Sequence, residues 1–191
     1  VNYTKYHGDY IMPYVGQTIT DVFPTSINVD TATIATANIS NQLTDANLPA
    51  GSVIQVVTAS HDSRVDSTST SYADTGLTCN ITPSSSSNKV MVIVSQNLGQ
   101  DRNNADASGD CQLLRDSTSI YEMTTMSFIE AGGSSTAKNI VSNSITVLDS
   151  PSTTSQITYK TQFAVNTTSN SGTSRANWGG PSIMTLMEVV G

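Results

Sequence analysis

Three adjacent residues, His61, Asp62 and Ser63, carry the side chains that a serine hydrolase uses as base, orienting group and nucleophile. Neighbouring side chains diverge along a strand or a loop, so consecutive residues cannot form that constellation. The other histidine, His7, lies far away along the chain, and no G-x-S-x-G nucleophile motif is present. The sequence therefore does not predict serine-hydrolase chemistry.

Carboxylates are the second group that could do chemistry. Three of them fall in one polar stretch and others are scattered along the chain: Asp101, Asp106 and Asp110, then Glu122, Glu130 and Glu188. Two carboxylates about 5 to 10 Å apart in a cleft could cleave a glycosidic bond, which leaves an envelope polysaccharide depolymerase as a distant alternative. With 6% aromatic residues, however, the chain offers few platforms for stacking sugars. We therefore predict a protein that is not an enzyme.

The stretch 101–110 also has oxygen ligands suited to a hard cation such as calcium. Its spacing departs from that of an EF-hand, because Ala105 stands where a third ligand should be and no glutamate closes the loop. A solvated loop is the expected structure, with a bound ion as the alternative. We predict no metal site and no cofactor.

The only two cysteines, Cys79 and Cys111, lie in apolar contexts. Two cysteines are not a disulfide framework, so we expect buried thiols that pack as small hydrophobic groups, with a disulfide as the alternative. Trp178 is the only tryptophan. We expect it to anchor a loop to the core or to a subunit interface, with a sugar-stacking role as the alternative.

The composition limits the partners of the chain. Charged residues make up 12%, about half of the usual ~25%, so Ser, Thr and Asn must supply solubility. The net charge is −7 and no basic cluster exists, which predicts no binding to nucleic acid. No apolar run approaches the roughly 20 residues of a membrane span, so we predict no membrane insertion. This composition is typical of a long-lived extracellular or particle-surface β protein.

The elements that position these side chains are predicted to be strands. Residues 76–82 alternate between apolar and polar, as a half-buried strand does. Residues 89–95 form a near-continuous apolar run rich in β-branched residues, which predicts a buried strand. Pro83 and the polar residues 84–88 between them predict a turn, so we expect the two strands to form a hairpin.

The rest of the chain from residue 53 gives the same picture. Further strands are predicted at 53–58, 111–115, 119–123, 139–148, 157–165 and 183–190, with a turn at Asp116 and Ser117. The stretches 59–71, 97–110, 128–137 and 166–180 are predicted to be loops, and no segment has sustained helical periodicity. The predicted fold class is all-β, an antiparallel β-sandwich or jelly-roll-like head at residues 50–191.

Residues 1–24 differ from the head, being aromatic-rich and without a regular period. Because tyrosine buries a large area at little entropic cost, we predict an extended arm that docks on a partner's surface. Packing back on its own domain is the alternative. The expected docking residues are Tyr3, Tyr6, Tyr10, Tyr14 and Phe23.

Residues 25–49 contain a loose apolar stripe among Thr, Ala, Asn and Asp. A segment this poor in large apolar residues cannot fold alone, but three copies wound together could bury the stripe on a three-fold axis. We predict a short trimeric stem, with a disordered linker as the alternative. The expected stem residues are Ile27, Val29, Ile34, Ile39 and Leu43.

Residues 49–190 resemble a module of tail-fibre and other structural proteins of bacteriophages. The resemblance rests on the order of five stretches: PAGSVIQVV, TSTSYADTGLTCNITPSSSSNKVMVIVS, CQLLRDSTSIYE, DSPSTTSQITYKTQF and IMTLMEVV. Residues 27–49 are also similar to the shafts that precede such heads. The resemblance implies a homotrimeric virion protein with β-sandwich heads around a three-fold axis and an N-terminal segment anchored to the particle. It brings no enzymatic residues.

Together these observations predict a non-enzymatic virion protein. We expect a homotrimeric short fibre or decoration (cement) protein on the virion surface, made in the host cytoplasm and anchored to the capsid by residues 1–24. Its expected partners are its own copies and the major capsid or tail proteins. The alternative is a tail-fibre or tail-tip adhesin that binds a glycan or protein of the host surface.

Overall fold

The computed structural model describes residues 48–103, 107–129, 136–166 and 172–191, all within the unit Ser40–Gly191. Every regular element in these ranges is a strand, as predicted. The strands are β1 (Val53–His61), β2 (Val65–Ser67), β3 (Ala73–Ile81), β4 (Lys89–Asn103), β5 (Ala107–Arg115), β6 (Thr118–Ile129), β7 (Thr136–Asp149), β8 (Ile157–Val165), β9 (Thr173–Ala176) and β10 (Ser182–Val189). The described part holds no helix that is long and apolar enough to cross a membrane.

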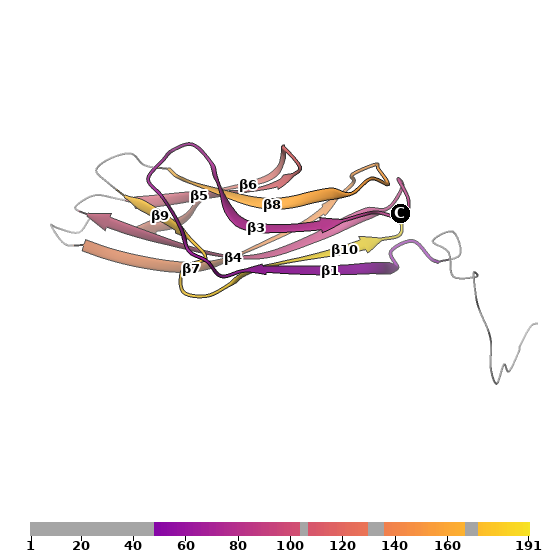
Figure 1. Ribbon diagram of the computed structural model, residues 1–191, viewed down its shortest axis with the longest axis horizontal. Helices are drawn as coiled ribbons and strands as arrows, with labels where there is room; N and C mark the ends of the chain where they lie inside the picture. The colour runs from indigo at the N-terminus through magenta and orange to yellow at the C-terminus, as the bar shows by residue number, and fades with distance from the viewer. Residues whose placement is uncertain (1–47, 104–106, 130–135, 167–171) are drawn as a thin grey trace, which may run out of the picture. The chain divides into compact units, whose positions relative to one another are not determined.

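The strands form two antiparallel sheets that lie face to face (Figure 1). In the large sheet, β4 pairs with β7 on one side; on the other it pairs first with β10 and then with β9. β1 flanks β10 and β2 flanks β9. We call the β1–β10 half of this sheet the base and the β9–β2 half the tip. The small sheet has the order β3-β8-β5-β6.

This topology confirms the predicted fold class. Without the short strands β2 and β9, the sheets are β1-β10-β4-β7 and β3-β8-β5-β6. Two four-stranded antiparallel sheets in this order make a jelly roll. A jelly roll hosts many unrelated functions, so function must be argued from its surfaces.

Alternation of residue types explains which side of each strand is buried. In β3, Leu77, Cys79 and Ile81 are buried, whereas Thr78 and Asn80 between them are exposed. The same rule holds in β4, β8 and β10. The largest fully buried apolar side chains are Tyr159, Phe163, Leu77, Ile81, Leu98, Leu113, Ile145, Met184 and Leu186.

Towards the tip the core becomes polar. Gln96 of the large sheet accepts a hydrogen bond from Thr161 Oγ1 of the small sheet (2.8 Å) and donates one to Ser182 Oγ (2.8 Å). Asn177 also lies between the sheets and donates to the main-chain oxygen of Thr75 (2.7 Å). Because these buried amides are hydrogen-bonded across the two layers, they fix how one sheet lies against the other.

The predicted hairpin between residues 76–82 and 89–95 is wrong. β3 pairs with β8, whereas β4 pairs with β7, β9 and β10, so the connection through Pro83 crosses from the small sheet to the large one. Each of the two strands has an apolar side to bury, and both sides are buried because the strands lie in opposite sheets with the core between them. The pattern of each strand shows this need but does not identify its hydrogen-bonding partner.

The turn at Asp116 and Ser117 is confirmed. It joins β5 to β6 as a two-residue hairpin loop, with Arg115 opposite Thr118. Asp116 takes a left-handed conformation (φ 53°), which aspartate tolerates better than most residues. Its main-chain N–H donates to Thr158 O (2.7 Å) and its carboxylate accepts from the Thr158 N–H (2.9 Å), so the turn is held to β8.

Four stretches predicted to be loops contain strand residues. Within 97–110, β4 continues to Asn103 and β5 begins at Ala107. β2 lies within 59–71, β6 and β7 extend into 128–137, and β9 lies within 166–180. These stretches are rich in Ser, Thr, Asn and Gly, which are usual in loops. Main-chain pairing of β4 with β7 and β9 nevertheless keeps its polar end extended.

Candidate interaction surface

The outer side of the large sheet at the base presents three rows of side chains, each row crossing β1, β10, β4 and β7. The first row is Val56, Met187, Met91 and Leu148; the second is Thr58, Thr185, Ile93 and Thr146; the third is Ser60, Ile183, Ser95 and Ser144. Their inward-pointing neighbours fill the core, so alternation directs these side chains outward. None of them carries a charge. We call these three rows the uncharged face.

The apolar members of the uncharged face are open to solvent. The exposed fractions are 57% for Val56, 48% for Leu148, 41% for Ile183 and 36% for Ile93. A single exposed apolar residue is ordinary, but a contiguous patch of them marks an interaction site. The patch spans all four strands, so it is a property of the sheet and not of one loop.

The outer side of the small sheet has the opposite character. Asp74 pairs with Lys160 (3.0 Å) and accepts a hydrogen bond from Gln162 Nε2 (2.7 Å). Gln112 Nε2 in turn donates to Gln162 Oε1 (2.8 Å), so polar contacts run across β3, β8 and β5. This is the charged, hydrogen-bonded surface that a sandwich shows to water.

The protonation of two groups on this side follows from their contacts. The hydrogen bond from Gln162, aided by Lys160, lowers the pKa of Asp74, because both favour the carboxylate. Partial burial and a hydrogen bond to Glu122 Oε1 (2.7 Å) raise the pKa of Tyr72, because both favour the neutral phenol. Both groups therefore keep their usual neutral-pH charge.

The cysteines are free and buried, as predicted. Burial raises the pKa of Cys79, and it raises the pKa of Cys111 to about 12. Thiols of this kind are unreactive core groups. Tyr159, whose hydroxyl donates to Asp149 Oδ2 (2.7 Å), has its pKa raised mainly by burial and then by this bond.

At the tip, the outer side of the large sheet carries charges and the tryptophan. Arg175 pairs with Asp66 (2.8 Å) and Asp101 (2.7 Å), and its guanidinium lies 5.1 Å from the centre of the Trp178 ring. The ring packs against Gly99, where an added Cβ would collide with a ring carbon. This packing supports the anchoring interpretation of Trp178.

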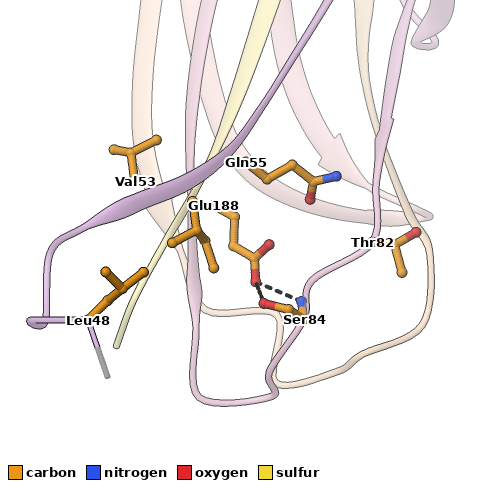
Figure 2. Close-up of a pocket in the computed structure, with 7 residues that line it drawn as sticks. Leu48, Val53, Gln55, Thr82, Ser84 and Glu188 are labelled. Carbon is orange, nitrogen blue, oxygen red and sulfur yellow. Dashed lines mark hydrogen bonds between the residues drawn. The ribbon is translucent and has the colours of Figure 1, made fainter. Parts of the chain in front are cut away.

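At the base, a hollow of about 620 Å³ lies beside the start of β1 (Figure 2). It is lined by Leu48, Val53, Ile54, Gln55, Thr82, Ser84 and Glu188. Glu188 is 1% exposed, and its Oε1 accepts hydrogen bonds from the Ser84 N–H and hydroxyl (both 2.7 Å) and from Asn88 Nδ2 (2.7 Å). When the amide of Gln55 is oriented to satisfy its neighbours, its nitrogen donates to Glu188 Oε2 (3.2 Å). The buried carboxylate thus ties the β3–β4 connection to β10.

Two sets of sequence-predicted residues lie outside the described ranges. They are the docking residues Tyr3, Tyr6, Tyr10, Tyr14 and Phe23, and the stem residues Ile27, Val29, Ile34, Ile39 and Leu43. Their roles remain predictions. The described chain begins at Leu48, which lines the hollow at the base.

Within the described ranges, several residues that could have done chemistry make structural contacts instead, whereas His7, Asp106 and Glu130 lie outside those ranges. His61 lies against Gly76. Asp101 is in β4 and binds Arg175, whereas Asp110 is in β5 and accepts from the Thr125 N–H (2.7 Å), so both lie in strands and not in the predicted loop. Within the described ranges, no three His, Cys, Asp or Glu side chains are placed to hold a metal ion.

The uncharged face was missed by reasoning from the sequence, although one signal was present. The run 89–95 has apolar residues on both sides, which is typical of a strand covered on both faces. In the structure only the inward side is covered: Val92 is fully buried, but Ile93 beside it is exposed. A single chain therefore covers only one of the two sides on which this strand was predicted to be buried.

No family model matches the chain, and no curated protein does so either. Among solved structures, it is similar to a chain of infectious bursal disease virus, Gx strain, with 12% identity, a TM-score of 0.36, and coverage of 87% of this chain and 42% of the other. A chain of the VP2 subviral particle of that virus has 11% identity and a TM-score of 0.34, with coverage of 71% of this chain and 37% of the other. A chain of its T13 particle has 10% identity and a TM-score of 0.35, with coverage of 82% of this chain and 40% of the other.

The chain thus spans about two fifths of the length of these viral chains. At TM-scores below 0.5, the similarity supports no conclusion about function.

Proposed function

We propose that this chain is a non-enzymatic structural protein of a bacteriophage virion, a homotrimeric short fibre or capsid decoration protein. Residues 1–24 anchor it to the capsid, residues 25–49 form a short trimeric stem, and residues 50–191 are the displayed jelly-roll head. The proposal joins the resemblance of the sequence to phage structural modules with the surface chemistry of the head.

The uncharged face is the observation that carries the proposal. One outer side of the sandwich is hydrogen-bonded and charged, through Asp74, Lys160 and Gln162. The other side, at the base, exposes apolar and hydroxyl side chains without a charge. Such a difference between two outer sheet faces is expected of a subunit, in which one face is covered and the other solvated.

The contacts of the candidate catalytic residues also favour a structural role. Asp101 is paired with a cation, and Asp110 supports the main chain of β6. A third carboxylate, Glu188, is buried and accepts hydrogen bonds from the β3–β4 connection. Each of these groups stabilises the fold.

The mechanism of such a protein is mechanical. Three heads on one stem place several equal surfaces close together, so that weak contacts add up to useful avidity. In a decoration protein, the arm instead bridges neighbouring shell subunits. Both forms need the head to be stable and the arm to supply the attachment.

Deleting residues 1–24 tests the proposal. We expect trimers of the shortened protein to survive in solution but to bind no capsids in a co-sedimentation assay with purified particles. The full chain, added to the same particles, is the control. Binding of the full chain to tails with bare capsids would contradict a capsid decoration protein and favour the adhesin.

The second candidate is a tail-fibre or tail-tip adhesin, and the tip of the head favours it. Trp178 lies near two cations, with Lys138 5.8 Å from the ring centre in addition to Arg175. Aromatic and cationic side chains together are usual in binding sites for polar ligands. An adhesin predicts that the isolated trimer binds host cells and competes with infection, and that a Trp178→Ala variant loses both activities. A depolymerase would in addition release sugars from the host envelope.

A further inference from the structure

We propose that the uncharged face is turned towards a three-fold axis and is covered by the same face of two further copies of this chain. The inference rests on the trimer of the proposed function and identifies the surface that joins the heads. It also predicts which edge strands meet: β1 of one copy lies beside β7 of the next.

The chemistry of the face suits a copy of itself. Its first row is apolar across all four strands, and the other two rows combine isoleucine with serine and threonine. Equal faces meeting at an axis would bring equal charges together, so the lack of charge over three rows removes the main obstacle to self-association. Lys89 and Lys138, on the same side of the sheet, lie beyond the first and third rows.

The width of the face fits three copies. Four strands about 4.8 Å apart place β1 and β7 roughly 14 Å from each other. If β1 of one copy lies about 5 Å from β7 of the next, three sheets enclose an axis at about 7 Å from each sheet. Facing sheets pack about 10 Å apart with interdigitating side chains, so a distance of about 7 Å from sheet to axis is one that large side chains such as methionine can fill.

Rings of other sizes fit less well. Four copies in the same arrangement would place each sheet about 11 Å from the axis, beyond the reach of Met91, Met187 and Ile93, and would leave an open channel. Two copies face to face would bury the face but would leave the outer edges of β1 and β7 uncovered. In the described ranges β1 pairs only with β10, and β7 pairs only with β4. Exposed strand edges of this kind invite further pairing.

A rotation about the axis keeps each row at one height, which gives a sharp test. Val56 and Leu148 are the two ends of the first row, so Val56 of one copy meets Leu148 of the next. In the full-length double variant V56C/L148C, we expect mild oxidation to give a covalent trimer on a non-reducing gel. Both positions are exposed in the single chain, and the native cysteines are buried, so neither folding nor background crosslinking should interfere.

Three controls follow from the geometry. Each single variant, V56C or L148C, should stay uncrosslinked, because the contact joins different strands. The mismatched pair V56C/S144C should also stay uncrosslinked, because Ser144 is four residues from Leu148, or about 13 Å along β7. The pair S60C/S144C at the ends of the third row should crosslink again.

The outcomes separate this inference from the proposed function. Covalent trimers from both matched pairs support the uncharged face as the surface that joins the copies. Adding Ile93→Lys should reduce the yield of covalent trimer several-fold, whereas the matched change Thr78→Lys on the small sheet should leave it unchanged. A trimer by light scattering without crosslinks from either matched pair overturns the face and leaves the trimeric virion protein standing. Dimers from the single variants overturn the ring of β1 against β7. A monomer by light scattering overturns the face and the proposed trimer together.

Discussion

At the level of single residues, Tyr159 illustrates how the core controls ionisation. Burial and the bond to Asp149 raise its pKa, so the folded state favours the neutral phenol. In the unfolded chain tyrosine ionises near pH 10. Above that pH the folded state binds more protons than the unfolded state, and the free energy of unfolding therefore falls as the pH rises.

Tyr159→Phe should separate these effects. At neutral pH the variant loses a hydrogen bond to a carboxylate, which destabilises the fold by about 1.5 to 3 kcal/mol. From about pH 10 upward its stability should fall less steeply than that of the unchanged protein. Urea unfolding across this pH range measures both, with Tyr121→Phe on the exposed surface of β6 as the control. Parallel pH profiles for Tyr159→Phe and the unchanged protein would contradict the assignment.

Glu188 is a second residue whose role can be measured. Glu188→Ala removes the acceptor for Ser84 and Asn88 and should lower the free energy of unfolding by about 2 to 4 kcal/mol. Glu188→Gln keeps one acceptor oxygen and should cost less, about 1 kcal/mol. Denaturant midpoints give both values. Equal losses in the two variants would show that the charge, and not the hydrogen-bond geometry, is what the site requires.

At the level of elements, β4 combines several environments in one strand. It pairs with β7 along its length, with β10 at the base and with β9 at the tip. Its outward positions change from Met91 and Ile93 to Gly99, on which Trp178 packs. A side chain at position 99 has no room unless the ring moves.

Gly99→Ala tests this close approach. The added methyl group would displace the Trp178 ring and should destabilise the head by about 1 to 3 kcal/mol. Because Trp178 is the only tryptophan, its fluorescence reports directly, and we expect emission shifted to longer wavelength. Thr78→Ala, at an exposed position of β3 outside the uncharged face, is the control. Unchanged emission in Gly99→Ala would place the ring elsewhere.

The sequence predicted the strands better than their partners. Residues 76–82 and 157–165 alternate or are apolar enough to be recognised, and β3 and β8 follow them closely. The polar end of β4 was missed because Gln96 and Gln100 face the core, where Thr161 and Ser174 satisfy their amides. That pairing depends on residues far apart in the chain, which a local pattern does not contain.

The same limit applies to the candidate surface. Apolar residues on both sides of residues 89–95 predicted burial on both faces, but not what would cover the second face. The uncharged face becomes visible only when β1, β4, β7 and β10 are placed side by side. Candidate chemistry was judged more easily, because adjacency alone argued against His61, Asp62 and Ser63 as a catalytic site.

At the level of the whole molecule, the uncharged face makes a prediction about solution conditions. An interface without charges is not weakened by ionic screening, and sulfate strengthens burial of apolar surface. We therefore expect the trimer's dissociation, followed by light scattering on dilution, to change little between about 0.05 and 1 M sodium chloride. The trimer should dissociate more readily on cooling, because apolar burial is then less favourable. Dissociation by salt would point to ion pairs and contradict this interface.

The pairing of β1 with β10 has a mechanical consequence. The head begins with residues that are held to the last strand: Gly51 donates to Val190 O (2.8 Å) and Val190 to Ser52 O (2.9 Å). From there β1 runs antiparallel to β10 through His61 opposite Ser182. Ladder hydrogen bonds lie perpendicular to the strands, so tension along β1 loads many of them at once in shear, instead of opening them one by one. A head that is pulled through residue 48 should therefore resist unfolding under that force.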